Sequence, residues 1–154
     1  MQPVDESYFK SAPQILSHSW LIPKPAAEVW AELTSDTPLH WCKGLDKITW
    51  TSARPFGVGT TRRVHALYGA IRSDERYFIW EEGRRQAFYF TGSNLPLFKS
   101  FAEDYLVEPE GDGSCRFTWT IALTPTALGK PGGPLNKVIF GGLFRDTGRY
   151  FNAA

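Results

Sequence analysis

A change in hydrophobic period is the feature that most constrains how this chain can fold. Between residues 46 and 124, runs rich in β-branched and aromatic residues alternate apolar with polar positions, which predicts strands with one covered face. Several intervening turns contain glycine, as in Gly111-Asp112-Gly113, so we expect neighbouring strands to pair as antiparallel hairpins in chain order. The six expected strands span residues 46–51, 60–67, 71–80, 86–91, 101–108 and 115–124.

One further strand and two short helices are expected before this central part. Residues 14–22 have the composition of an edge strand, and Pro23 ends it. Pro25 then occupies a first helical position, and residues 38–43 are expected to form a second short helix. The first helix, at residues 25–33, is predicted from apolar residues spaced three and four apart, namely Ala26, Val29, Trp30 and Leu33.

The C-terminal segment predicts a long amphipathic helix that covers the apolar face of the sheet. It follows a linker rich in proline and glycine at residues 130–134 and runs to about Phe151. Its expected inner row repeats at helical spacing and consists of Leu135, Val138, Ile139, Gly142, Leu143 and Asp146. Gly141, Gly142 and Gly148 lie inside this helix at a cost in helix propensity. Two interpretations stay open, either close packing of helix on sheet or space for a cavity.

Composition limits the class of protein. The 154 residues suffice for one domain with a real core, and we expect residues 13–154 to form it behind an N-terminal arm at residues 1–12. With 17 Lys and Arg against 16 Asp and Glu, the chain has no positive excess for binding nucleic acid. Aromatic residues make up 15% of the chain, which predicts a core or a concave site lined with rings.

Motifs for several other functions are missing from the sequence. It contains no Gly-x-Ser-x-Gly elbow, dinucleotide fingerprint, P-loop or metal-ligand spacing. Cys42 and Cys115 are interpreted as two buried thiols. No stretch has the length of a membrane span or the pattern of a signal peptide. We therefore expect a cytoplasmic protein, monomeric or homodimeric, with no metal, no other cofactor and no nucleic-acid partner.

Several short stretches, in this order, resemble one superfamily. They are Ile22-Pro23-Lys24-Pro25-Ala26-Ala27-Glu28-Val29-Trp30, Phe56-Gly57-Val58-Gly59-Thr60, Glu75-Arg76 with Trp80 and Arg84-Arg85, and Glu108-Pro109-Glu110-Gly111-Asp112-Gly113-Ser114 before Thr118-Trp119-Thr120. Together they resemble the START-related helix-grip superfamily (SRPBCC or Bet v 1-like), in its polyketide cyclase/dehydrase and lipid-transport branch.

The resemblance implies an α+β helix-grip fold. Its curved antiparallel sheet of about seven strands wraps around a long C-terminal helix, with two short helices after the first strand. In this superfamily the pocket between helix and sheet carries sterols, lipids or plant hormones, cyclises polyketide chains, or only binds a ligand.

Strand alternation predicts which side chains face such a pocket. If Phe117 and Trp119 face the helix, the same phase turns Val107 inward on the preceding strand and Ile79 inward on an earlier one. The candidate ligand-binding residues are Ile71, Ser73, Tyr77, Phe88, Phe90, Phe101, Tyr105, Phe117, Trp119, Ile139, Gly142 and Leu143. The hydroxyl groups of the two tyrosines would either orient a ligand oxygen or only complete an amphipathic wall.

Glu75 and Glu103 fall on these inward rows, and they are the candidate catalytic residues. A buried carboxylate must be paired, hydrogen-bonded or protonated. One interpretation is general acid/base catalysis by a carboxyl group with a raised pKa. The other is a structural ion pair with Arg62 or Arg72. The pairs Arg62-Arg63 and Arg84-Arg85 are themselves interpreted as solvated strand ends.

Three hypotheses for function follow. The first is binding or transport of a hydrophobic small molecule, such as a lipid, a sterol or an aromatic polyketide-like compound. The second is a cyclase or dehydratase in which a buried glutamate moves protons without a metal or nucleotide cofactor. The third is a regulatory module that binds another protein.

Overall fold

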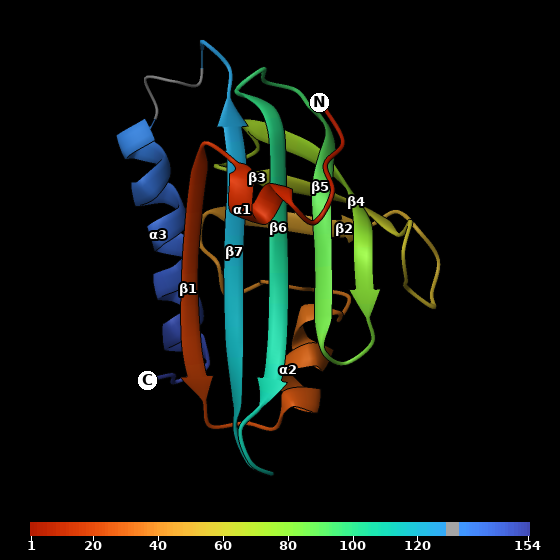
Figure 1. Ribbon diagram of the computed structural model, residues 1–154, viewed down its shortest axis with the longest axis vertical. Helices are drawn as coiled ribbons and strands as arrows, with labels where there is room; N and C mark the ends of the chain where they lie inside the picture. The colour runs from red at the N-terminus through yellow and green to blue at the C-terminus, as the bar shows by residue number, and fades with distance from the viewer. Residues whose placement is uncertain (129–132) are drawn as a thin grey trace.

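The computed structural model describes residues 1–128 and 133–154, which form one antiparallel sheet and three helices (Figure 1). The sheet has seven strands in the order β1-β7-β6-β5-β4-β3-β2. Its strands are β1 (Gln14–Ile22), β2 (Leu45–Trp50), β3 (Thr61–Ala66), β4 (Ile71–Glu81), β5 (Arg85–Ser93), β6 (Phe98–Pro109) and β7 (Cys115–Pro125). The helices are α1 (Tyr8–Ser11), α2 (Ala26–Leu33) and α3 (Gly133–Tyr150).

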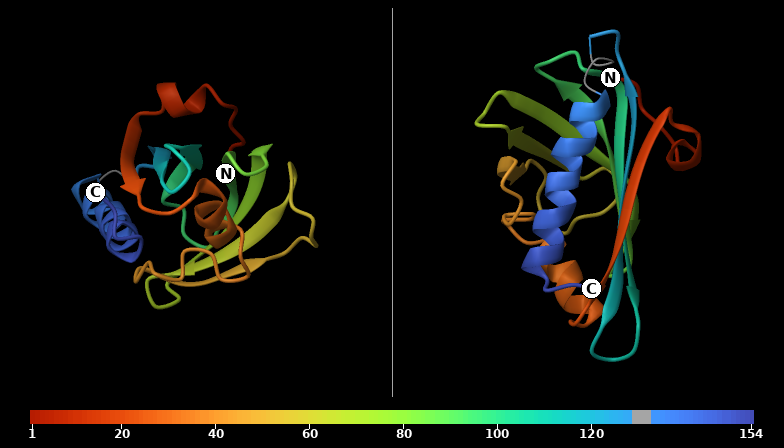
Figure 2. Two further views of the ribbon diagram at one scale, coloured as in Figure 1. Left: turned by 90° about the horizontal axis from the view of Figure 1, so that it is seen from below. Right: turned by 90° about the vertical axis from the view of Figure 1, so that its left-hand side faces the viewer.

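The sheet curls, and two of the helices lie on its concave side. Figure 2 shows the long helix α3 running across this side near β1. The short helix α2 contacts β6. Strands β2 to β7 pair in chain order, and β1 closes the opposite edge by pairing with β7. The expected α+β fold, with hairpins in order and a long C-terminal helix, is confirmed. Of the expected linker, residues 130–132 lie outside the described residues.

The predicted alternation holds along the central strands. On β7, Phe117, Trp119, Ile121 and Leu123 are fully buried, whereas the intervening threonines lie on the outer face. There Thr118 and Thr120 share hydrogen bonds with Ser19 and Ser17 of β1, at 2.7 and 3.0 Å. On β6, the inward row is buried as expected and consists of Phe101, Glu103, Tyr105 and Val107. One face of the sheet therefore forms the core.

The expected inward position of Ile79 is wrong. The pairing of β4 with β5 shifts register between Tyr77 and Ile79, which inserts an extra residue and changes the phase of the alternation. Trp80 therefore follows Tyr77 on the inner face, with ring centroids 5.1 Å apart. Trp80 also meets Trp30 of α2 edge to face, with centroids 5.6 Å apart. A bulge of this kind depends on the partner strand, so alternation within β4 alone does not locate it.

Only one of the two helices expected after β1 forms. α2 lies where the first was predicted, but residues 38–43 form turns. Leu39 has a φ of 56°, a left-handed conformation that an α-helix does not contain. Its carbonyl oxygen accepts a hydrogen bond from the Cys42 amide at 3.0 Å. The segment therefore reverses direction instead of continuing as a helix, and it buries the Leu39 side chain in the core.

The inner face of α3 is displaced from the expected row. Val138 was expected to face the sheet, but 71% of its surface is exposed. Leu143 of the expected row is buried, and the other buried positions include Phe140 and Thr147, three residues before it and four after it. The curled sheet therefore approaches a stripe of the helix beside the expected one. Asp146 is buried and accepts a hydrogen bond from the Lys43 amide at 3.0 Å. The expected role of Leu135 falls on a side chain outside the described ones.

The glycines of α3 differ in their surroundings. A Cβ atom added at Gly148 would lie 2.9 Å from Nε1 of Trp20, which is closer than real Cβ contacts, so Gly148 allows close packing of the helix on β1. A Cβ at Gly142 would meet only the Arg145 side chain, at 3.6 Å. At Gly141 it would meet no heavy atom within 4 Å beyond its own turn of helix, among the residues described. Close packing is thus the interpretation that holds for Gly148.

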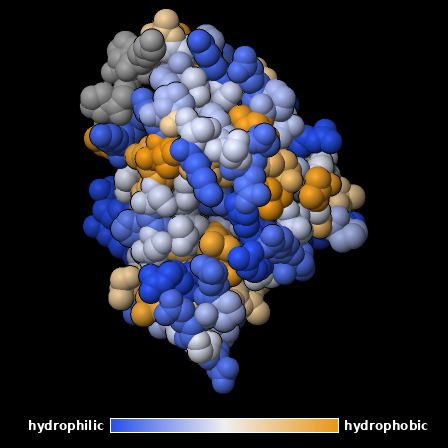
Figure 3. Space-filling view, in the orientation of Figure 1, coloured by the Kyte–Doolittle hydropathy of each residue, from blue (hydrophilic) through white to orange (hydrophobic). Residues whose placement is uncertain are grey.

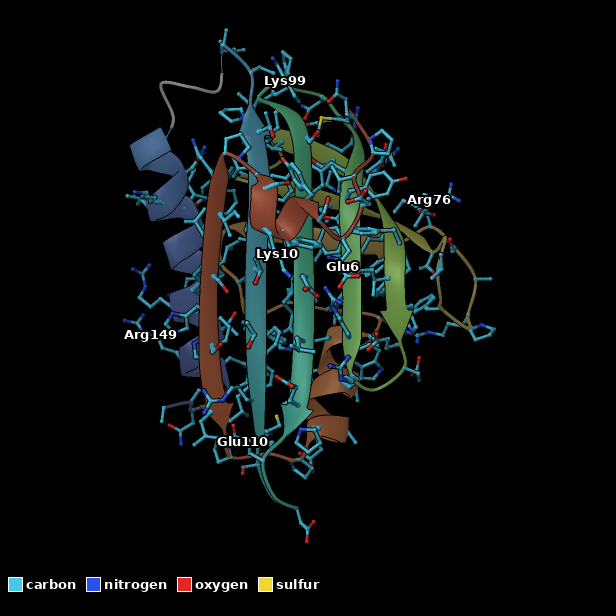
Figure 4. The ribbon with its side chains drawn as sticks, in the orientation of Figure 1. Glu6, Lys10, Arg76, Lys99, Glu110 and Arg149 are labelled. Carbon is cyan, nitrogen blue, oxygen red and sulfur yellow. The ribbon has the colours of Figure 1, made fainter. Side chains whose placement is uncertain are left out.

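Residues 1–12 run across the outer face of the sheet. The Tyr8 hydroxyl lies 2.7 Å from Oγ1 of Thr124, and the Phe9 ring stacks on Phe78 with centroids 6.1 Å apart. Glu6, which lies over the sheet in Figure 4, pairs with Arg85 at 2.7 Å. Figure 3 shows this outer side, where hydrophobic residues are scattered among hydrophilic ones. In the described part of the chain, none of the helices has both the length and the apolar character of a membrane span.

Candidate functional site

A cavity of about 130 Å³ lies between the concave face of the sheet and α3. Strands β2 to β7 and helix α3 all contribute to its wall, which is mostly aliphatic and aromatic. Its charged lining comes from β3, β4 and β6, where Arg62, Glu75 and Glu103 lie. The cavity thus combines an apolar wall with a small charged end, an arrangement typical of ligand sites.

Most of the predicted pocket residues reach the cavity. Both glutamates line it, together with Ile71, Ser73, Phe90, Phe101, Tyr105, Trp119, Ile139 and Leu143. Tyr77, Phe88 and Phe117 do not line it, although they belong to the same packed core. Gly142 does not line the cavity either and belongs to a shallow groove next to it, with Lys43 and Arg145.

The sequence interpretation missed about half of the wall. The missed residues are Leu39, Gly44, Leu45, Ile48, Arg62, Val64, Ala66, Leu67, Leu97, Phe98, Asn136 and Phe140. The alternation of Arg62, Val64 and Ala66 along β3 was a signal that could have placed three of them. The interpretation of Arg62 as a solvated strand end is wrong, since 1% of its surface is exposed.

Arg62 and Glu75 form a buried ion pair across two neighbouring strands. The residues stand directly opposite each other in the pairing of β3 with β4, and Nε of Arg62 donates a hydrogen bond to Oε2 of Glu75. The guanidinium also lies 4.5 Å from the ring centroid of Phe88 and 5.4 Å from those of Trp50 and Tyr77. Aromatic faces attract a cation and help to hold it inside. Of the two ion pairs considered for Glu75, the one with Arg62 is present.

Glu103 is held by hydrogen bonds to one of its two oxygens. Oε2 accepts from the Tyr105 hydroxyl and from Nε1 of Trp119, each at 2.9 Å. The Tyr105 oxygen in turn accepts from Nη2 of Arg62 at 3.4 Å. Oε1 of Glu103 makes no hydrogen bond with any residue that the structure describes. A chain of polar groups therefore links the ion pair to Glu103 and leaves one carboxyl oxygen free at the cavity.

The two glutamates differ in protonation. Burial raises the pKa of Glu103 to about 8, the negative charge of Glu75 adds to this, and Arg62 opposes it. Burial also raises the pKa of Glu75, but the guanidinium in direct contact counteracts this. We assign the negative charge to Glu75 and a neutral carboxylic acid to Glu103 at pH 7, because only Glu75 touches a cation.

The two cysteines are buried and unpaired, as expected. Burial raises the pKa of Cys42 to about 12, so its thiol stays protonated and unreactive at neutral pH. Its sulfur lies 3.8 Å from both the Leu143 carbonyl oxygen and the Thr147 hydroxyl. Across residues 1–128 and 133–154, no group of three or more His, Cys, Asp or Glu side chains is arranged to hold a metal ion.

The curled seven-stranded sheet, the long helix across its concave face and the cavity between them define a helix-grip protein of the START-like, Bet v 1-like class. Residues 13–151 match the family described as polyketide cyclase / dehydrase and lipid transport. The chain belongs to this family.

Relatives and solved structures agree with this assignment. An uncharacterised protein of Mycobacterium tuberculosis is 38% identical over 118 residues, which are 74% of this chain and 70% of that protein. A START superfamily protein from Mycobacterium smegmatis has a similar fold, with a TM-score of 0.69 at 12% identity, covering 88% of this chain and 92% of that one. Ginseng major latex-like protein 151 has a TM-score of 0.64 at 18% identity, covering 90% and 97%.

Proposed function

We propose that this protein binds a small hydrophobic molecule in the cavity between the sheet and α3. The observation that carries the proposal is the apolar cavity with Arg62 and Glu103 at one end. The family description, which names lipid transport, supports the same class of function. A binding role requires only this pocket, whereas an enzyme also requires a reacting group.

The volume of the cavity limits the ligand. At about 130 Å³, it is smaller than the roughly 300–1,000 Å³ of pockets for drug-sized molecules. It is close to an engineered protein cavity of about 150 Å³ that takes benzene. A one-ring compound therefore fits the space as it stands. A sterol or a long acyl chain would fit only if α3 moved away from the sheet.

Calorimetric titration with apolar compounds of increasing size tests the proposal. Ile139→Trp should abolish binding, because Ile139 lines the cavity and the larger ring would fill it. Val138→Trp is the matched control, since the neighbouring Val138 side chain points to solvent, and it should bind like the wild type. Saturable binding lost only in Ile139→Trp supports the proposal. Binding that survives in both variants would place the ligand elsewhere.

A second candidate is a cyclase or dehydratase, and Glu103 is the observation that favours it. A carboxylic acid with a pKa of about 8 and one free oxygen at a cavity can donate a proton to a carbonyl oxygen or accept one beside it. Glu75 is less suited to this role, because it is already paired with Arg62. With a poly-β-ketone substrate analogue, Glu103→Gln should abolish turnover and spare binding. Unchanged turnover would remove Glu103 from the chemistry.

A further inference from the structure

The polar end of the cavity has hydrogen-bond donors left over. Nη1 of Arg62 is buried and has no hydrogen-bond partner among the described residues, although Nε and Nη2 of the same guanidinium are bonded. Buried donors are nearly always satisfied, so an orphaned one needs an explanation. Arg62 belongs to the cavity wall. An acceptor supplied by a bound molecule would complete its set of hydrogen bonds.

Glu103 offers a second donor in the same wall, linked to Arg62 through the Tyr105 hydroxyl. Its Oε2 already accepts two hydrogen bonds, at 2.9 Å each, so the acid proton belongs on Oε1, which has no partner in the described structure. Glu103 also lines the cavity. Two donors from β3 and β6 therefore lie in one wall, and they have the same requirement, an acceptor oxygen.

The charge balance of the site selects a neutral acceptor. The single positive charge of Arg62 is already matched by Glu75 in direct contact. A ligand carboxylate would add a second negative charge beside Glu75, in surroundings where uncompensated charge is expensive. A ketone or similar carbonyl group accepts from both donors without adding charge.

We propose that the cavity is selective for a neutral, one-ring-sized carbonyl compound whose oxygen accepts hydrogen bonds from Arg62 and Glu103. This inference rests on the proposed binding function and specifies its ligand class. Ring size follows from the volume of about 130 Å³, and the carbonyl follows from the two unpaired donors.

Three compounds of nearly equal shape test the inference. Acetophenone carries the carbonyl, α-methylstyrene replaces the oxygen by a CH₂ group, and benzoate replaces the methyl ketone by a carboxylate. Calorimetry at pH 7 should show acetophenone binding about tenfold more tightly than α-methylstyrene, as expected for one net hydrogen bond. It should also bind more tightly than benzoate. In addition, the infrared C=O stretch of ¹³C-labelled acetophenone should move to lower frequency on binding.

Two variants assign the preference to Glu103. Glu103→Gln keeps an amide donor at this position and should retain the preference for acetophenone. Glu103→Leu removes this donor and leaves only that of Arg62, so it should reduce the preference for acetophenone over α-methylstyrene. Circular dichroism and thermal unfolding establish that each variant is folded. If the leucine variant does not fold, the infrared shift in the wild-type protein still tests whether the ligand carbonyl accepts a hydrogen bond.

The outcomes separate this inference from the proposed function. Equal binding of acetophenone and α-methylstyrene overturns the carbonyl requirement but leaves a hydrophobic pocket. Tighter binding of benzoate overturns the requirement for neutrality. If none of the three compounds binds but larger apolar compounds do, the inferred ligand class is wrong, while the proposed binding of hydrophobic molecules is retained. If nothing in either series binds, both proposals fail.

Discussion

At the scale of single residues, the polar groups around Glu103 decide how the site behaves. Facing it are Arg62 from β3, Glu75 from β4, Tyr105 from β6 and Trp119 from β7. The structure places one cation among two carboxyl groups, so only one carboxyl group has a direct counter-charge. The other remains a neutral acid at neutral pH.

Glu103 should make the protein less stable as pH rises. Its folded pKa of about 8 lies above its ordinary value of 4.5, so the folded state holds the proton more tightly than the unfolded chain does. The free energy of unfolding therefore falls between about pH 4.5 and pH 8 and then levels off. Glu103→Gln removes this contribution. Urea unfolding at pH 5 to 9 should show that the free energy of unfolding of Glu103→Gln rises relative to that of the wild type as pH rises.

The control for this experiment is Glu81→Gln. Glu81 is exposed and pairs with Arg84 on the surface, so its stability difference from the wild type should change little with pH. A constant difference between wild type and Glu103→Gln across the whole range would contradict the assignment of a raised pKa.

Breaking the buried ion pair should be costly. Arg62→Met leaves Glu75 buried without its cation, and removing one partner of such a pair destabilises by about 3–5 kcal/mol. The double variant Arg62→Met/Glu75→Leu should recover part of this loss, because no unpaired charge remains. Urea unfolding of the single and double variants measures the coupling.

The exposed pair Arg63–Asp74 on the same two strands provides a matched comparison. Arg63→Met should cost far less stability than Arg62→Met, because water and salt screen an exposed pair. If the Arg62 and Arg63 variants lost equal stability, the buried pair would not be the structural element described above.

At the scale of elements, the contact between α3 and β1 depends on a glycine. Gly148→Ala would place a methyl group 2.9 Å from Nε1 of Trp20, and overpacking of this kind typically costs about 1–3 kcal/mol. Gly141→Ala occupies open space on the same helix and should gain up to about 1 kcal/mol of helix propensity. The melting temperatures of the two variants should therefore shift in opposite directions, down for Gly148→Ala and up for Gly141→Ala. A stabilised Gly148→Ala would show that α3 can shift freely against β1.

At the scale of the whole molecule, the N-terminal segment supports the sheet from outside. None of the residues of α1 is buried, and its contacts lie on the face of the sheet away from the cavity. Deletion of residues 1–12 removes the hydrogen bonds of the Tyr8 hydroxyl and the backbone bond from Gln2 to Lys99, together with the ring stack of Phe9 and the ion pair of Glu6. The truncated protein should lose about 1–3 kcal/mol of stability from the hydrogen bonds and the ring stack and retain its ligand affinity. Loss of binding with stability unchanged would assign the segment a role in the site.

The sequence by itself determined the order of the elements. Seven strand positions, the pairing of neighbouring strands, the helix after β1 and the helix at the C-terminus all follow from local period, turn residues and proline positions. The inward rows of β6 and β7 follow from the same alternation, and they include Glu103 and Trp119. These features are predictable because each depends on residues close together in the chain.

Only the tertiary structure decided how these elements meet. The bulge that turns Trp80 inward depends on β5, and the stripe of α3 that excludes Val138 depends on the curl of the sheet. Arg62 is buried because Glu75 and three aromatic rings come to it from other segments. The volume of the cavity depends on all of these contacts at once. The alternation along β3 can indicate that Arg62 points inward, but the partners that hold its charge there come from segments far apart in sequence.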